Sequence, residues 1–202
     1  MRITRFWGQI VQDAETPSLQ PLISCETGEA LKPYVKVLET ARVALRWLET
    51  DDAAFILQLL NEPSWLRFIG DKGIRTVEDA RNYIEDGPVA MYRRLGFGLY
   101  LVELKDSRES IGICGLIKRD SLEDVDLGFA FLPAFWGEGY AFESGAAVMD
   151  YGRRTFGLSR LLAITSQDNE PSARLLGKLG FHFERLTRLA PDAAEVKVFA
   201  TT

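Results

Sequence analysis

The 202-residue sequence has little of the chemistry on which several common classes of protein depend. It holds two cysteines and one histidine, too few for a disulfide framework or for a zinc site of Cys and His ligands. Cys114 lies in a strand-like run where a buried, inert thiol is the ordinary role, and His182 has no second His or Cys nearby. No Gly-x-Ser-x-Gly segment is present, which disfavours a Ser-His-Asp hydrolase. We therefore expect neither a metal site nor a disulfide.

Long apolar runs and an excess of positive charge are also missing. No run approaches the roughly 20 apolar residues that a membrane-spanning helix needs, and the N-terminus lacks the hydrophobic segment of a signal peptide. The net charge of −5 argues against a dedicated nucleic-acid-binding protein, in spite of the Arg153-Arg154 pair. We expect a cytoplasmic protein without a membrane or nucleic-acid partner.

Residues 1–38 are rich in turn formers, whereas strand and helix patterns alternate from residue 39 onward. We predict an N-terminal extension over 1–38, with a small hairpin as one option, and a single domain over 39–202. Alternating apolar residues predict a strand at 43–47. Helical spacing predicts one helix that begins after Thr50 and is stopped by Pro63, and a second that begins at Thr76 and is broken by Gly87-Pro88.

The second half of the chain predicts a mixed sheet. Three strands, at 98–104, 110–117 and 124–132, form an antiparallel meander, and a long helix follows at about 140–155. The next strand, at 160–165, runs parallel to strand 124–132 because a crossover helix separates the two. A helix that begins at Asn169 and ends at Gly180, then two strands at 181–189 and 195–200, complete an α/β fold.

The clearest functional signal lies between Asp126 and Phe142. An apolar strand stops at Pro133, and the segment Trp-Gly-Glu-Gly-Tyr-Ala at 136–141 leads into the long helix. Glycines let successive N–H groups converge at a helix start, which favours an anion such as a phosphate. The segment is neither a dinucleotide fingerprint nor a Walker loop, because the third glycine and a Gly-Lys-Ser/Thr are absent. An ordinary turn without a ligand is the alternative.

Two segments together resemble the GNAT N-acetyltransferases, and within them the Rim-type, ribosomal-protein-alanine branch. The first comprises Asp126-Leu127-Gly128-Phe129, Leu132-Pro133 and Trp136-Gly137-Glu138-Gly139-Tyr140-Ala141. The second runs from Asn169-Glu170-Pro171-Ser172 to Lys178-Leu179-Gly180-Phe181. The resemblance covers roughly residues 37–202. It implies the GNAT fold, in which strand 124–132 splays from its parallel neighbour, often at a bulge, and it implies acetyl-CoA as the acyl donor.

The resemblance also implies a cofactor site built mainly from backbone groups. The N–H groups of six residues would hold the pyrophosphate of acetyl-CoA: Trp136, Gly137, Glu138, Gly139, Tyr140 and Ala141. Phe131 and Leu132 would bond the pantetheine arm and place an amide near the thioester carbonyl as an oxyanion donor. Asn169 would hydrogen-bond the arm, with helix capping as its other reading. In the family the turn usually opens with Gln or Arg, so Trp136 removes one polar contact with the phosphate. Three roles are open to Trp136: it covers the turn, it lines the mouth of the acceptor site, or it packs in the core.

Acetyl transfer to an amine needs a base for the ammonium and an acid for the departing thiolate. Asp126 stands where the Rim-type branch carries an acidic residue, and we expect it to be the base, directly or through water. An exposed strand-edge carboxylate is its alternative role. Many GNAT enzymes use a tyrosine as the acid, but Leu176 occupies that place here. Ser172 is the expected substitute, with helix capping as its alternative role.

The residues do not identify the acceptor. By resemblance its site is built by residues 62–75 and the last two strands, where Trp65, Phe68, Tyr83 and Tyr92 line a pocket or belong to the core. We expect an N-acetyltransferase that moves the acetyl group of acetyl-CoA to a primary amine, of a protein N-terminus or a small molecule, through a ternary complex. The alternatives are an antibiotic or polyamine acceptor and a non-catalytic acyl-CoA-binding or regulatory module. A homodimer is compatible with the sequence.

Overall fold

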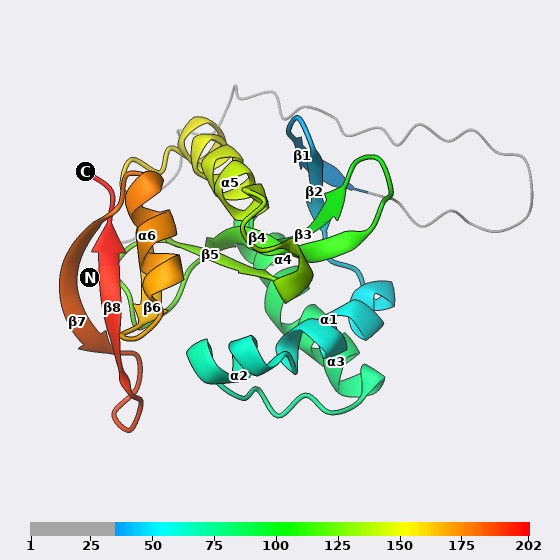
Figure 1. Ribbon diagram of the computed structural model, residues 1–202, viewed down its shortest axis with the longest axis horizontal. Helices are drawn as coiled ribbons and strands as arrows, with labels where there is room; N and C mark the ends of the chain where they lie inside the picture. Colours follow the sequence, from blue (N-terminus) through cyan, green and yellow to red (C-terminus); the bar gives the residue numbers. More distant parts are fainter. Residues whose placement is uncertain (1–34) are drawn as a thin grey trace, which may run out of the picture. The chain divides into compact units, whose positions relative to one another are not determined.

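A computed structural model describes residues 35–202, in which helices cover both faces of a mixed β-sheet (Figure 1). The hairpin considered for residues 1–38 lies outside the described residues, except for the short edge strand β1 (Lys36–Glu39). This strand spans the boundary that we predict between extension and domain. It pairs antiparallel with β2.

The sheet has eight strands in the order β1-β2-β3-β4-β5-β6-β8-β7. The strands after β1 are β2 (Val43–Trp47), β3 (Leu99–Leu104), β4 (Ser110–Ile117), β5 (Asp126–Phe131), β6 (Leu162–Ser166), β7 (His182–Arg188) and β8 (Glu195–Ala200). All neighbours are antiparallel except β5 and β6, which are parallel. The predicted α/β fold with a mixed sheet is confirmed.

The parallel strands β5 and β6 separate almost at once. They share one registered pair, Asp126 with Leu162, and then diverge. On its other side β5 pairs with β4 in an unbroken ladder from Ile117–Asp126 to Gly112–Phe131. The expected splay is therefore present, but the bulge that often accompanies it is absent from this ladder.

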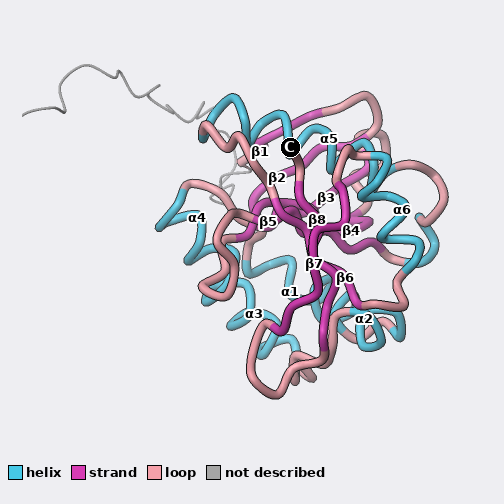
Figure 2. The backbone as a smooth tube through the Cα atoms, turned by 90° about the vertical axis from the view of Figure 1, so that its left-hand side faces the viewer, coloured by secondary structure: helices cyan, strands magenta, loops and turns pink. Residues whose placement is uncertain are grey.

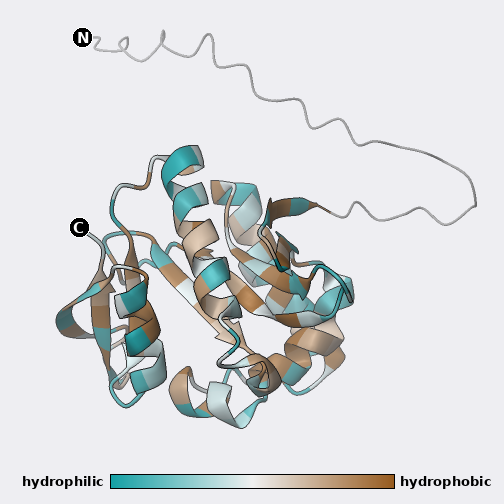
Figure 3. Ribbon diagram, turned by 45° about the horizontal axis from the view of Figure 1, so that its top comes forward, coloured by the Kyte–Doolittle hydropathy of each residue, from teal (hydrophilic) through white to brown (hydrophobic). Residues whose placement is uncertain are grey.

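Two sets of helices cover the two faces of the sheet, as two perpendicular views show (Figures 1 and 2). One face carries α5 (Tyr140–Phe156) and α6 (Glu170–Lys178), and the other carries α1 (Ala53–Leu60), α2 (Pro63–Phe68) and α3 (Val77–Ile84). The strands are largely hydrophobic, whereas the outward faces of α5 and α6 carry hydrophilic residues (Figure 3). Burial of the apolar faces against the sheet is the main favourable term for such a fold.

Proline chemistry shapes two helix boundaries. The predicted stop at Pro63 is confirmed, since α1 ends at Leu60, and Pro63 also opens α2, where its missing N–H has no partner to lose. Gly87-Pro88 was expected to break the second helix. Instead a π-helical segment, η2 (Glu85–Val89), joins α3 to α4 (Ala90–Leu95). The wider turn accommodates a proline ring that would clash in a regular α-helix.

Short 3-10 turns and caps complete the architecture. The turn η1 (Thr50–Asp52) precedes α1, and η3 (Pro133–Phe135) follows β5. At the start of α3, the Thr76 hydroxyl accepts from the Asp79 N–H at 3.1 Å, and the Asp79 carboxylate accepts from the Thr76 N–H at 2.8 Å. The weak capping box predicted from Thr76 and Asp79 thus makes both of its bonds.

Candidate active site

The starts of two helices and the ends of two parallel strands meet at one place. β5 and β6 end there, α5 begins after the turn that follows β5, and α6 begins at Glu170, directly after its N-cap Asn169. Both helices therefore direct the positive ends of their dipoles towards the gap between the splayed strands. Ligands of α/β sheets bind at such carboxyl ends.

The Gly turn at 136–141 offers unpaired N–H groups. Gly137 and Gly139 have φ angles of 83° and 85°, which a residue with a side chain rarely adopts. Within residues 35–202, no hydrogen-bond acceptor is found for the N–H groups from Gly137 to Phe142. This arrangement fits an anionic ligand such as a diphosphate. The N–H of Trp136 is already bonded to the Pro133 carbonyl at 3.2 Å, so this member of the expected set is not available.

The backbone of β5 corrects the expectation for Leu132. Its N–H donates to the Ile111 carbonyl at 3.0 Å, and its own carbonyl accepts from the Phe135 N–H at 3.0 Å. Because successive residues of a strand alternate in direction, the backbone groups of Phe129 and Phe131 face the gap instead. Phe131 is the gap-facing member of the expected pair, and Phe129, which the sequence did not single out, faces the gap as well.

Trp136 lies at the edge of this gap. Its side chain is 52% exposed, so core packing does not explain it. The indole Nε1 donates a hydrogen bond to the Phe131 carbonyl at 2.8 Å. The indole thus covers one of the backbone groups expected to contact the pantetheine arm.

Asp126 is buried, with 1% of its surface exposed, so the alternative of an exposed carboxylate is wrong. One carboxylate oxygen accepts from Arg119 Nε at 3.0 Å, and the other has no partner among the described residues. Burial raises the pKa of Asp126, and the Arg119 charge opposes this shift without cancelling it. The side chain shares a face of β5 with Ala130 and Leu132, which pack on the α1–α3 side of the sheet.

Tyr83 of α3 lies near the same ion pair. Burial raises the pKa of its phenol, and the positive charge of Arg119 acts in the opposite direction. Asp126, Arg119 and Tyr83 thus form a polar cluster on the face opposite α5 and α6. A carboxylate with a raised pKa and a free oxygen is a stronger proton acceptor than an ordinary aspartate.

Asn169 and Ser172 open α6. The Asn169 side-chain oxygen accepts from the Ser172 N–H at 3.1 Å, so Asn169 is the N-cap of this helix. Ser172 is partly exposed, and no partner of its hydroxyl is recorded within residues 35–202. Leu176 is buried in the core, and its side chain is apolar, so it cannot serve as an acid.

Of the four aromatic residues considered for the acceptor pocket, two belong to the core. Trp65 is buried against α1 and α3, and Tyr92 is buried on the other side of the sheet. The Tyr92 hydroxyl accepts from the Leu48 N–H at 3.1 Å and donates to the Leu99 carbonyl, which is a structural role. Phe68 and Tyr83 are partly exposed and remain candidates.

An ion pair that the sequence did not reveal joins α2 to the connection between β6 and α6. Arg67 of α2 contacts the carboxylate of Asp168, just before α6, at 2.9 Å. Both side chains are exposed, so the pair is accessible. No pattern in the sequence links two residues that lie so far apart along the chain.

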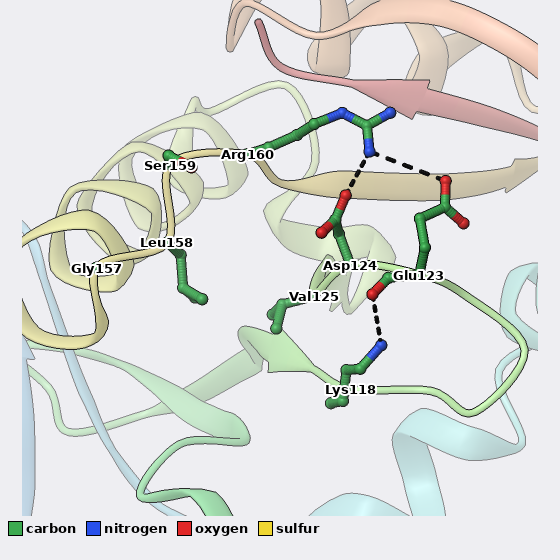
Figure 4. A pocket seen from close by; sticks show the side chains of 8 residues that line it. All are labelled: Lys118, Glu123, Asp124, Val125, Gly157, Leu158, Ser159 and Arg160. Carbon is green, nitrogen blue, oxygen red and sulfur yellow. Dashed lines mark hydrogen bonds and ion pairs between the residues drawn. The ribbon is translucent and has the colours of Figure 1, made fainter.

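A hollow of about 210 Å³ lies at the opposite end of β5 and α5 from the Gly turn (Figure 4). Its charged groups are already used: Arg160 pairs with Asp124, and Lys118 Nζ donates to the Glu123 carbonyl at 2.9 Å. The 17 residues of α5 separate it from the turn by about 24 Å at the usual helical rise. We therefore do not assign the reaction to this hollow.

The chain belongs to the GNAT acetyltransferase family, because the model of the acetyltransferase (GNAT) domain matches residues 42–182. The protein is accordingly an acetyl-CoA-dependent acyltransferase. The uncharacterized N-acetyltransferase YoaA of Bacillus subtilis is 31% identical over 153 residues, 75% of this chain and 86% of the relative.

Solved structures share the fold. An acetyltransferase from Agrobacterium tumefaciens superposes with a TM-score of 0.69 at 24% identity, covering 86% of this chain and 98% of that one. RimL, a ribosomal alpha-N-protein acetyltransferase solved in complex with coenzyme A, gives a TM-score of 0.68 at 19% identity, covering 80% and 94%.

No group of three or more His, Cys, Asp or Glu side chains in residues 35–202 could hold a metal ion. No helix of the same residues is long and apolar enough to span a membrane.

Proposed function

We propose that the protein transfers the acetyl group of acetyl-CoA directly to a primary amine, of a protein N-terminus or a small molecule, through a ternary complex. The observation that supports this most is the set of unpaired N–H groups from Gly137 to Phe142, at the splay between β5 and β6. A diphosphate at the turn would let the pantetheine arm run along the gap. The thioester would then lie beside the gap-facing backbone of Phe129 and Phe131.

Asp126 is the proposed base, and its place on the α1–α3 face puts the acceptor there. The carboxylate takes a proton from the ammonium, through water where the distance requires it, so that nitrogen can attack the thioester carbon. An N–H of the β5 backbone stabilises the oxyanion that forms. As the carbon–sulfur bond breaks, the thiolate takes a proton from the hydroxyl of Ser172, and the second proton that the nitrogen loses passes through water to restore this hydroxyl. The products are an N-acetylated amine and CoA.

Within the family we propose the Rim-type branch, with a protein N-terminus as the acceptor. The motif around Asp126 and the fold shared with RimL support this assignment. An antibiotic or polyamine acceptor remains the alternative within the enzyme class. We also propose a cytoplasmic site of action and allow for a homodimer.

One observation favours a non-catalytic acyl-CoA-binding module as the second candidate. Asp126 is buried and already paired with Arg119, as a purely structural carboxylate would be. The unpartnered second oxygen weighs against that reading, because a structural carboxylate buried to this degree normally has all its bonds satisfied.

An acceptor screen tests the proposal. Acetyl-CoA is mixed with the full chain and a panel of amines: peptides with free N-termini, amino acids, polyamines and aminoglycosides. Thiol release above the background without acceptor is expected for at least one peptide. Binding of acetyl-CoA without release for any amine would favour the non-catalytic candidate, and release only with a polyamine or aminoglycoside would contradict the Rim-type assignment.

A further inference from the structure

Arg42 lies against the Gly turn, although it comes from the short connection between β1 and β2. Its Nη1 donates to the Glu138 carbonyl at 3.0 Å, and its guanidinium lies over the Tyr140 ring, 4.5 Å from the centroid. A Cβ built on Gly139 would lie 3.3 Å from Nη2. Arg42 therefore contacts Glu138 and Tyr140 and lies close beside Gly139, in the segment that carries the free N–H groups.

Glu143, on the first turn of α5, holds Arg42 in this position. One carboxylate oxygen accepts from Arg42 Nε at 2.8 Å, and the other accepts from the Arg42 N–H at 2.9 Å and the Thr40 hydroxyl at 2.5 Å. Burial raises the pKa of Glu143, but the hydrogen bonds from Thr40 and Arg42 outweigh it and lower the pKa overall. The carboxylate is therefore charged at neutral pH, and the Arg42 side chain is oriented by a charge-assisted pair.

The turn needs a positive charge that it does not contain. Glu138 and Glu143 place two negative charges in or beside it, and a diphosphate would add more. The dipole of α5 supplies about half a positive charge. Trp136 stands where the turn of similar proteins opens with Gln or Arg. Among residues 35–202, Arg42 is the cation that hydrogen-bonds to this turn.

We propose that Arg42 supplies the positive charge of the pyrophosphate site, from outside the turn itself. The inference rests on the proposed function, since it takes the diphosphate of acetyl-CoA as the ligand. Nη2 has no hydrogen-bond partner among the described residues, so it is the nitrogen available to a phosphate oxygen. Glu143 acts as a positioning residue, because it fixes the guanidinium without reaching the ligand.

Calorimetric binding of CoA to the full chain tests the proposal. Arg42→Gln keeps much of the size and removes the charge, and it should raise the Kd about tenfold, the usual scale for a charge-assisted bond. Arg42→Lys restores the charge but not the guanidinium geometry, so its Kd should lie between those of the wild type and Arg42→Gln. Arg153→Gln, an exposed position in the last turn of the same helix, is the matched control and should not change the Kd.

The salt dependence of the Kd distinguishes an electrostatic contribution of Arg42 from a purely structural one. The Kd of the wild type should rise more steeply between low and high salt than that of Arg42→Gln, because screening removes an interaction that the variant lacks. An unchanged Kd in Arg42→Gln, a lysine variant as weak as the glutamine variant, or equal salt dependence would overturn the assignment. A wild-type chain that does not bind CoA would contradict the proposed function instead, and this is seen before any variant is compared.

Discussion

The proposed cofactor side of the site is formed mainly by backbone groups, whereas the proposed acceptor side is formed mainly by side chains. The proposed cofactor side consists of backbone N–H groups at a glycine turn and at two helix starts, each of which lies in one short motif. The proposed acceptor side consists of side chains from α2, α3 and the β4–β5 connection. The first can be read from a short motif, and the second can be found only when the chain is folded. The two sides should therefore respond differently to substitution.

The largest effect is expected on the acceptor side. Asp126→Asn should lower kcat about 100-fold or more, because general-base catalysis typically contributes at least this much. Since burial raises the pKa of Asp126, the wild-type rate should rise as pH rises through that value, and the variant should lose this rise. The pH–rate profile with the best amine of the screen is the measurement.

Asp124→Asn is the matched control for Asp126. This carboxylate lies two residues earlier, just before β5 begins, and pairs with Arg160 instead of Arg119. Its removal should leave the profile unchanged. If the pH–rate profile of Asp126→Asn keeps the wild-type shape, Asp126 is not the base. Deprotonation of the amine would then proceed through a water relay that does not involve Asp126.

On the cofactor side, Gly139→Glu should raise the Kd for acetyl-CoA about 100-fold, because it adds a strained backbone and a negative charge at the anion site. Gly157→Glu is its control. Gly157, just after α5, also has a positive φ angle of 66°, so it carries a similar strain and the same charge at the other end of the helix. Equal loss of CoA binding in both variants would mean that the turn has a structural role and does not bind the pyrophosphate.

Ser172→Ala should lower kcat about tenfold with little change in the Kd for acetyl-CoA, because the hydroxyl is proposed to act only as the thiolate departs. The cap of α6 is made by the Asn169 side chain and the Ser172 backbone, and it survives this substitution. An unchanged kcat would mean that Ser172 has only a structural role at the start of α6. The melting temperature checks that α6 remains intact.

The smallest effect is expected at the exposed pair of Arg67 and Asp168. Arg67→Ala should raise the KM of the amine about threefold and leave the Kd for acetyl-CoA unchanged, since exposed ion pairs contribute little energy. Arg81→Ala removes a comparable exposed pair with Glu78, within α3, and serves as the control. A change in CoA binding in Arg67→Ala would show that the two sides are not separate.

Local chemistry explains what the sequence could and could not predict. The strands of the meander, the long helix and the Gly turn follow from alternation, helical spacing and glycine, and the structure contains all of them. The choice between Leu132 and Phe129 depends on the register of β5 against β4, which no local pattern specifies. The Arg42–Glu143 pair joins segments 101 residues apart, and the Arg119–Asp126 pair closes across the β4–β5 connection, so both contacts become visible only after folding.

The single registered pair between β5 and β6 also has a mechanical consequence. Five strands lie on one side of it and three on the other, so the ladder across the whole sheet is interrupted except at Asp126 and Leu162. An extended pantetheine arm in the gap would take the place of the missing ladder and bond strands that otherwise do not meet. The acyl donor would then act as a cross-link as well as a reactant, tightening the sheet when it enters and loosening it when CoA departs.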